Sequence, residues 1–482
     1  MTAATPHPTP RPERFDLILF WLLIAIVALA PLPLGSNRPL PAAMLAFATG
    51  LALVLWTLRL LLYGKVAVPV RRIRLPLILF GIVAGWILLQ SLSIVPRSWA
   101  DPIWEVASSA LDRPLAGSIS VNPGATRTAL MHLLTYAGIF WLALQLTRPP
   151  ERARLALAAV SLIGAAYAVY GIVIYVTGND WILIYRKWIY HDALSSTFVN
   201  RNSFATFAGL GLLAAIVYFI NGFRHLLAIN RPLRQRLALI ADTIFSRALI
   251  RTVSMMALMV ALVLTGSRAG IASSMIGALA LMVSFARGSS LKTSHIAVMS
   301  GIIMGTMAIV FLINGGLLVS RLGDDDTDLL ASDRHIVYEA TMDAIMTAPW
   351  TGTGYGTFRD VFAAYRPETL SSRFYWDKAH NDYLENALEL GIPAALLLNL
   401  SIALLALEAL KGLWRRRRDR GIPAIAVAAT ILVGCHSLLD FSLQIPAVSI
   451  LYAFLLGLGV GQSWPHRSRR QPNAAAISQA LS

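Results

Sequence analysis

The chain has 482 residues, of which 56% are hydrophobic and only 14% are charged, and its mean hydropathy is +0.63. Soluble domains carry roughly 25% charged residues, so this composition excludes an ordinary soluble protein. The formal net charge is +16, but the basic residues are scattered over short segments and form no motif that reads nucleic acid. Anionic lipid headgroups are a sufficient partner for such residues. We therefore expect membrane lipids, and no nucleic acid, as partners.

Long apolar runs predict transmembrane helices. An α-helix needs roughly 20 apolar residues to cross the hydrocarbon core of a bilayer. The pattern predicts an all-α integral membrane protein with about 12 transmembrane helices and one large loop on the outer side. The expected spans are 15–34, 42–62, 75–95, 126–146, 153–177, 203–221, 248–265, 270–286, 295–315, 384–410, 422–438 and 446–463.

The positions of Lys and Arg predict the orientation of these spans. Cytoplasmic segments carry an excess of both residues, and most of them fall in the segments that share a side with the N-terminus. Both termini are then cytoplasmic, in agreement with an even number of spans. The chain divides into a cytoplasmic tail (1–14), spans one to nine (15–315), a large outer loop (316–383), spans ten to twelve (384–463) and a cytoplasmic tail expected to be disordered (464–482).

The large outer loop contains a predicted amphipathic helix. Apolar residues recur at helical spacing between Ser332 and Thr347, and Pro349 ends the pattern. The glycines of Thr351–Gly356 then predict a tight turn. Such long loops tend to be functional or disordered. We expect the amphipathic helix to lie on the membrane or to cover a cavity.

Two patterns suggest cofactors only weakly. Asp324–Asp326 with Asp328 could hold a divalent cation, but a run of like charges is also typical of a solvated surface. The glycines of 351–356 form no phosphate loop, because no Lys-Ser/Thr follows them and no strand precedes them. The single cysteine, Cys435, provides neither a disulfide framework nor a cysteine metal site. We expect no metal and no nucleotide cofactor.

The outer loop ends in a markedly polar segment, Ala379–Asn386, directly before an apolar run. Ionisable residues at a membrane boundary are costly and mark candidate functional sites. His380 can accept a proton from an attacking hydroxyl at neutral pH. Asn381 could orient its ring, and Asp382 or Glu385 could stabilise its charged form. In the alternative interpretation, Asn381 or Asp382 caps the next helix and His380 merely lies at the interface.

Arginines at the outer ends of spans form a second candidate constellation. Arg201 lies between Asn200 and Asn202, Arg268 lies in a Gly-Ser-Arg-Ala-Gly turn, and Arg334 lies in the predicted amphipathic helix. Guanidinium groups bind phosphate oxygens through paired hydrogen bonds. Pairing with the acidic residues of the outer loop is the alternative, although few acids lie near Arg201 or Arg268 in the sequence.

A third polar pair lies near the C-terminal end of the eleventh predicted span. His436 and Asp440 are four residues apart, on one face of a helix, and Gln444 follows at the same spacing. These groups could line a cavity as a polar network. A hydrogen bond between helices inside the bundle explains them equally well.

The order of these landmarks resembles that of the bacterial O-antigen ligase and O-antigen polymerase superfamily. The periplasmic signature of that family is a His followed by Asn, Ser or Gln, then nine residues and a Gly, and His380, Asn381 and Gly391 match it. The family usually has Gly, Thr or Tyr three residues later, where this chain has Ala394. The other landmarks that resemble the family are 200–202, 266–270, the helix of Arg334 that leads to Pro349, the Gly-rich turn 351–356, and 436–441.

The resemblance implies a bacterial inner-membrane protein of about twelve transmembrane helices with its active cavity on the periplasmic side. The donor would be a glycan on undecaprenyl diphosphate, and the glycosyl transfer would need neither a nucleotide sugar nor a metal. By the same resemblance, His380 would be the general base that activates the acceptor hydroxyl. Arg201 and Arg268 would bind the diphosphate, with Arg334 as a further candidate.

Four functions remain open, and the acceptor separates the first three. A ligase would transfer the glycan to lipid A–core, a polymerase to a growing polysaccharide, and an O-oligosaccharyltransferase to a protein. The fourth, a transporter of lipid-linked sugars, should carry charged residues along the middle of several spans. Here the charged residues gather at the outer ends of the spans, which favours an enzyme and, first among the three, a ligase.

Overall fold

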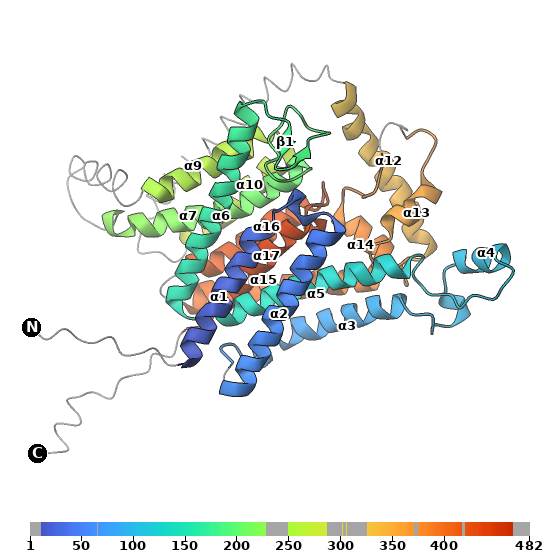
Figure 1. The fold of residues 1–482 in the computed structure, drawn as a ribbon, viewed down its shortest axis with the longest axis horizontal. Coiled ribbons are helices and arrows are strands. Elements are labelled where there is room, and N and C mark those ends of the chain that lie inside the picture. Colours follow the sequence, from blue (N-terminus) through green and yellow to red (C-terminus); the bar gives the residue numbers. More distant parts are fainter. Residues whose placement is uncertain are drawn as a thin grey trace, which may run out of the picture.

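The computed structural model describes residues 11–64, 66–227, 249–286, 301, 305, 325–370, 375–416 and 420–465. These residues are mostly helical, as the hydropathy pattern predicts (Figure 1). The exception to the helical pattern is a short antiparallel pair, β1 (Trp181–Ile182) and β2 (Tyr185–Arg186), with Trp181 opposite Arg186.

The helical bundle is built from long apolar helices. Five of them are long and apolar enough to cross a membrane: α2 (Pro39–Tyr63), α5 (Pro123–Leu146), α6 (Pro150–Val176), the 201–222 part of α7 (Arg201–Leu227), and α15 (Ile392–Arg415). The others are α1 (Arg11–Leu29) and the shorter α3 (Arg74–Gln90), α9 (Leu249–Leu264), α10 (Arg268–Ala286), α16 (Gly421–His436) and α17 (Pro446–Gly461).

These helices agree with a membrane protein, while the number of about twelve spans stays a prediction. Of the expected ninth span, 295–315, only residues 301 and 305 are described. Apolar side chains on the outer face of α2 point away from the protein, with Phe47 and Leu61 75% and 78% exposed. Surfaces of this kind are rare on soluble monomers and suit contact with lipid.

Helix α17 forms the centre of the bundle. All of its residues, from Pro446 to Gly461, are buried. It packs on α5, α7, α15 and α16. Small residues permit this close approach, because a Cβ at Gly457 would collide with the Phe140 carbonyl and one at Gly459 with the Ala426 side chain. The long helices of the chain are thereby fixed around one buried helix.

The expected span 384–410 differs in its boundaries, because the chain breaks at Gly391. The short helix α14 (Asp382–Leu390) ends there, and α15 begins at Ile392. Gly391 adopts φ 78°, and a Cβ at this position would collide with the Trp350 carbonyl. Hydropathy alone misses the break, since apolar residues continue on both sides of it. The glycine of the sequence signature is therefore a site of close backbone approach.

A small second core lies at one end of the bundle, over the segment expected to be an outer loop. It is formed by α12 (Asp325–Thr347), α13 (Phe358–Tyr365) and α14. The expected amphipathic helix within Ser332–Thr347 is confirmed, and its apolar face, which includes Val337 and Ala344, packs on Phe358 and Leu388. The helix therefore covers other protein elements with its apolar face.

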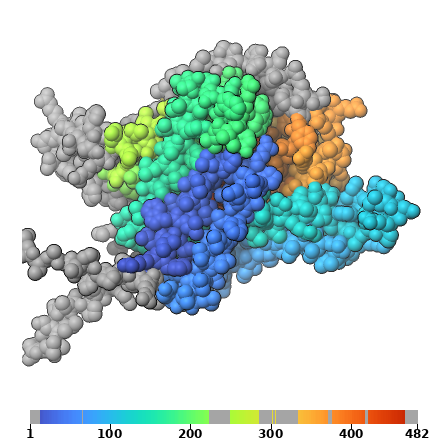
Figure 2. Space-filling view, in the orientation of Figure 1, coloured from blue at the N-terminus to red at the C-terminus, as the bar shows by residue number. Residues whose placement is uncertain are grey.

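Another short amphipathic helix, α4 (Ile103–Ala110), connects α3 to α5 and extends beyond the bundle, as Figures 1 and 2 show. Four turns of 3-10 helix complete the described chain. They are η1 (Leu34–Ser36), η2 (Val70–Arg72), η3 (Arg97–Trp99) and η4 (Ser442–Gln444).

The two ends of the described chain meet at one end of the bundle. Asp16, near the start of α1, pairs with Arg59 at 2.6 Å and lies 3.7 Å from Arg152. Arg148 donates hydrogen bonds to the carbonyls of Gly461 and Trp464, at the end of α17. Helices α12–α14 lie at the opposite end (Figure 1). The even number of spans stays a prediction.

Candidate functional site

His380 occupies a strained position immediately before helix α14. Its backbone φ is 54°, in the left-handed region that non-glycine residues rarely adopt. Asn381 is the N-cap of α14, and its Oδ1 accepts hydrogen bonds from the backbone N–H of Tyr383 and Leu384. Tyr338 Oη also donates a hydrogen bond of 2.9 Å to the His380 carbonyl. Strain maintained by such surroundings is characteristic of functional positions.

The imidazole of His380 is oriented by two aromatic rings and one carboxylate. Trp376 and Phe441 contact it edge-on, with ring centroids 5.3 Å and 4.7 Å away. Its Nδ1 lies 3.3 Å from Oδ1 of Asp440, and its side chain is 18% exposed. Since Nδ1 faces the carboxylate, Nε2 is the nitrogen available to a substrate proton.

Asp440 is fully buried and ionised. Burial alone would raise its pKa, but contact with His380 and the nearby charges of His436 and Arg334 hold the pKa of this carboxyl well below its usual range. The backbone N–H of Phe441 donates a further hydrogen bond of 2.8 Å to Oδ1. An ionised carboxylate at this position stabilises a positively charged imidazole.

Two of the three arginines predicted from sequence lie in this electrostatic environment. Arg334 donates a hydrogen bond of 3.3 Å to the carbonyl of Leu439. The guanidinium of Arg201 lies over the ring of Tyr190, with Cζ 5.1 Å from the centroid. Burial and the charge of Asp440 raise the pKa of Tyr190, while Arg201 and Arg334 lower it. Tyr190 therefore contacts Arg201 and is also influenced by the charges of Asp440 and Arg334.

Arg268 is the exposed first residue of α10. The turn before it approaches Arg201, because a Cβ at Gly266 would lie 3.7 Å from Arg201 Nη1. Asn200 Oδ1 accepts a hydrogen bond of 2.7 Å from the N–H of Asn202, at the start of α7. These contacts place the beginnings of α7 and α10 side by side.

We refer to His380, His436, Asp440 and Arg334 as the His380 cluster. Several buried polar atoms in this cluster have no hydrogen-bond partner among the described residues: Arg334 Nε, His380 Nδ1, both ring nitrogens of His436, and Asp440 Oδ2. The His380–Asp440 contact is thus close enough for an ion pair but not aligned as a hydrogen bond. Buried groups without partners are uncommon in folded proteins and mark places where ligands or functional strain require them.

The remaining carboxylates predicted for the site stabilise the scaffold. Asp382 accepts hydrogen bonds from Ser437 Oγ at 2.6 Å and Gln444 Nε2 at 3.3 Å. Glu385 accepts one from the N–H of Ala379 at 2.8 Å and pairs with Lys378 at 3.4 Å. The carboxylate that faces His380 is Asp440, which is distant in the sequence. The expectation that Asp382 or Glu385 stabilises the charged imidazole is therefore wrong.

Glu389 is a structural residue that the sequence pattern did not indicate. Its carboxylate accepts hydrogen bonds of 2.8 Å from the N–H groups of Gly356 and Phe358, and so holds the Gly-rich turn against α14. Burial raises the pKa of Glu389 to about 8 and that of Asp382 to about 7. Both carboxyls lie on the buried face of α14.

The expectation that the protein uses no metal stays a prediction. Within the described ranges, no group of three or more His, Cys, Asp or Glu is arranged to hold a metal ion. Asp324 of the acidic run lies outside the described residues, and the side chains of the others, Asp325, Asp326 and Asp328, are not described either.

The site and fold together describe a polytopic membrane protein with a histidine–carboxylate pair beside arginines. Residues 253–399 match the family model described as O-antigen ligase. This match confirms the resemblance inferred from sequence and supports the O-antigen ligase superfamily. It includes Arg268, Arg334 and His380, whereas Arg201, His436 and Asp440 lie outside it. No curated protein matches the sequence.

Proposed function

We propose that the protein is an O-antigen ligase-type glycosyltransferase of the bacterial inner membrane. It transfers a glycan from undecaprenyl diphosphate to a hydroxyl of lipid A–core on the periplasmic face, and both of its termini are cytoplasmic. The observation that carries the proposal is the 3.3 Å contact between His380 Nδ1 and the buried, ionised Asp440. The O-antigen ligase match of residues 253–399 supports the class of reaction.

In the proposed reaction, Nε2 of His380 removes the proton of the acceptor hydroxyl. The acceptor oxygen forms a bond to the anomeric carbon of the donor sugar, and the bond between this carbon and the phosphate oxygen breaks. Undecaprenyl diphosphate leaves with the electron pair. Asp440 stabilises the imidazolium that forms, in the way that a carboxylate supports a catalytic histidine elsewhere.

The arginines act on the leaving group in this reaction. Arg201, Arg334 and Arg268 stabilise the negative charge that develops on the departing diphosphate. Guanidinium groups can do so without a divalent cation, because each presents paired N–H donors to phosphate oxygens. The proposed transfer is therefore independent of metal. A chelator that stops turnover by the purified protein would contradict this part of the proposal.

The experiment that tests the function is a lipopolysaccharide gel from the native host carrying His380→Ala. Loss of all O-chains from lipid A–core, with long polymer on the polyprenyl carrier, identifies a ligase. Lipid A–core capped by a single repeat identifies a polymerase of the same superfamily. An unchanged ladder excludes both and directs the search to exported polysaccharide and glycoproteins, or to transport without transfer.

A further inference from the structure

The position of Asp440 depends on the turn that carries it, because this residue belongs to no helix. Helix α16 ends at His436, and the chain turns before η4 begins at Ser442. Within the turn, the N–H of Asp440 donates a hydrogen bond of 3.0 Å to the His436 carbonyl. Leu438 and Leu439 are 53% and 46% exposed, so burial of these two side chains contributes little to holding the turn in place. Contacts with other elements must therefore fix the direction of the Asp440 carboxylate.

Ser437 connects this turn to the start of α14 through two hydrogen bonds. The N–H of Asp382 donates one of 2.9 Å to the Ser437 carbonyl, and Ser437 Oγ donates one of 2.6 Å to Asp382 Oδ2. Both residues are buried. Asn381 Nδ2 adds a third hydrogen bond, of 3.1 Å, to the Leu438 carbonyl. Buried hydrogen bonds that run in both directions rigidify the two segments that they join.

The carboxyl group of Asp382 holds the chain on both sides of Asp440. Oδ2 accepts from Ser437, three residues before Asp440, and Oδ1 accepts a hydrogen bond of 3.3 Å from Gln444 Nε2, four residues after it. Asp382 itself lies two residues after His380. The contacts of Asp382 and the contact between Asp440 and His380 therefore join the same two segments. Because the segments are shared, loosening the first set of contacts should displace the second.

We propose that Ser437 and Asp382 are positioning residues that hold Asp440 against His380. The inference rests on the proposed glycosyl transfer and deepens it, because it gives a role in the reaction to a carboxyl that does not face the imidazole and to a serine outside residues 253–399. Each acts through Asp440, whose carboxylate lies 3.3 Å from Nδ1 of His380. A displacement of about 1 Å is enough to reduce the rate of a reaction that depends on such a contact.

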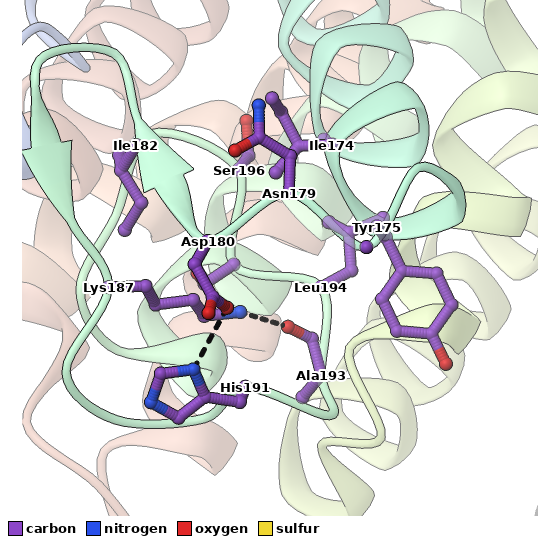
Figure 3. Close-up of a pocket in the computed structure, with 13 residues that line it drawn as sticks. Ile174, Tyr175, Asn179, Asp180, Ile182, Lys187, His191, Ala193, Leu194 and Ser196 are labelled. Atoms are coloured by element: carbon purple, nitrogen blue, oxygen red, sulfur yellow. Dashed lines mark hydrogen bonds and ion pairs between the residues drawn. The ribbon is translucent and has the colours of Figure 1, made fainter.

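Another histidine–carboxylate pair of the chain provides an internal comparison. His191 Nδ1 lies 3.0 Å from Asp180 Oδ1, in the segment between α6 and α7 (Figure 3). Both side chains are about half exposed, and the two residues are 11 positions apart in the sequence. This pair depends on the conformation of one local segment and not on the turn after α16. A substitution at Ser437 should therefore leave His191 unchanged.

The first measurement examines His380 without any substrate. The full chain, labelled with nitrogen-15 at histidine, is placed in nanodiscs, and solid-state NMR reports which ring nitrogen carries the proton of the neutral imidazole. The signals that disappear in His380→Ala are those of His380. In the wild type we expect the proton on Nδ1, because this nitrogen faces Asp440.

Ser437→Ala should leave the proton shared between the two nitrogens of His380, as Asp440→Asn does, while the signals of His191 stay the same. Signals of His380 that do not change in Ser437→Ala would overturn the proposal. The absence of a fixed proton position in the wild type would overturn it as well, because the turn would then not hold Asp440 against the ring.

Kinetics tests the same proposal through a double-mutant cycle. Ser437→Ala should lower kcat by about 10–100-fold with little change in KM, because the pair that accepts the proton is misaligned while substrate binding is retained. In an Asp440→Asn background, Ser437→Ala should cause no further loss, since it acts through Asp440. Multiplication of the two losses, or a rise in KM at constant kcat, would contradict the positioning role.

Two further variants complete the test. Gln444→Met removes the second donor to Asp382 and should show the same two effects to a smaller extent, which decides the matter if Ser437→Ala yields too little folded protein. Ser401→Ala removes a buried hydrogen bond of 2.9 Å from α15 to the Pro76 carbonyl and, as the matched control, should keep the wild-type kcat. If His380→Ala turns over like the wild type, the proposed function fails, whereas the NMR signals still decide whether Ser437 positions Asp440.

Discussion

The two polar ends of the bundle differ in how far their buried polar atoms are paired. At the end of the bundle near the first residues of α1, Arg148 donates to the carbonyls of Gly461 and Trp464, and Arg416 donates to Gln462 just after α17. Gln462 in turn donates hydrogen bonds of 2.7 Å and 2.8 Å to the carbonyls of Thr147 and Arg148. We call these residues the arginine clamp. The clamp completes the backbone hydrogen bonds that a helix end leaves open.

At the opposite end, the His380 cluster keeps buried donors and acceptors without partners, although burial of such groups without hydrogen bonds is unfavourable by about 1–3 kcal/mol each. The comparison teaches that a buried charge by itself does not indicate function. The clamp uses its charges to finish a helix, whereas the cluster leaves buried atoms of Arg334, His436 and Asp440 without hydrogen-bond partners among the described residues. Activity should therefore depend on the cluster, and stability on the clamp.

The largest effect is expected at His380. His380→Ala should lower the transfer rate by about 10²–10⁴-fold, since a positioned general base contributes that much, while leaving the amount of protein in the membrane unchanged. The measurement is the initial rate of the purified protein with lipid-linked donor and acceptor. His335→Ala, on the exposed face of α12, is the control. Wild-type turnover by His380→Ala would remove the general base from the proposal.

Replacing Arg268 by Lys should reduce the rate by about 10²-fold. The charge is retained, but the paired N–H donors that match a diphosphate are lost. Because Arg268 is exposed at the start of α10, the folded protein should be unaffected. Arg113→Lys, at the exposed end of the connection after α4, serves as the control in the same rate assay. Full activity of Arg268→Lys would argue against a role in binding diphosphate.

At the arginine clamp, we expect a substitution to lower stability and to leave activity unchanged. Arg148→Gln should lower the free energy of unfolding by about 2 kcal/mol, because the charged hydrogen bonds to the end of α17 are lost. The kcat of the protein that remains folded should not change. Thermal unfolding in detergent and the rate assay measure the two quantities. Arg415→Gln removes an arginine that pairs with Glu408 at the surface, and should change the stability by less than 1 kcal/mol.

How much of this arrangement the sequence could predict depends on whether the interacting residues are neighbours in the chain. His380, the cap at Asn381 and the helix within Ser332–Thr347 were all recognisable, because each depends on local spacing. The signal for Tyr338 was also present, since it lies one helical turn after Arg334 on α12.

The partners of His380 could not be predicted from local spacing. Asp440 was a candidate residue, but its contact with His380 joins α14 to the turn after α16 and follows from the tertiary packing alone. Tyr190 lies in an irregular segment and meets Arg201 for the same reason. The break at Gly391 escaped the hydropathy pattern, because that pattern records apolarity and not the backbone conformation. The sequence therefore predicted the catalytic candidate better than its environment.

The smallest effect concerns the buried carboxyl of Asp382, beside the His380 cluster. Burial raises its pKa to about 7, so between pH 4 and pH 7 the folded protein retains a proton that the unfolded chain has released. Unfolding then releases a proton, and the stability contributed by this group is lost as the pH rises towards 7. Asp382 should contribute at most about 1.4 kcal/mol per pH unit to this slope. Asp382→Asn should therefore be less steep than the wild type, and the slope that remains comes from Glu389, whose pKa burial raises to about 8.

Thermal unfolding of the wild type and of Asp382→Asn at pH 5, 6, 7 and 8 measures this slope. Asp343→Asn, an exposed carboxylate on α12, should keep the wild-type dependence on pH. A profile of Asp382→Asn parallel to that of the wild type would mean that Asp382 is ionised in the folded protein. Asp382 would then add a second buried negative charge near that of Asp440. Together the two carboxylates would stabilise a protonated His380 more strongly than Asp440 alone.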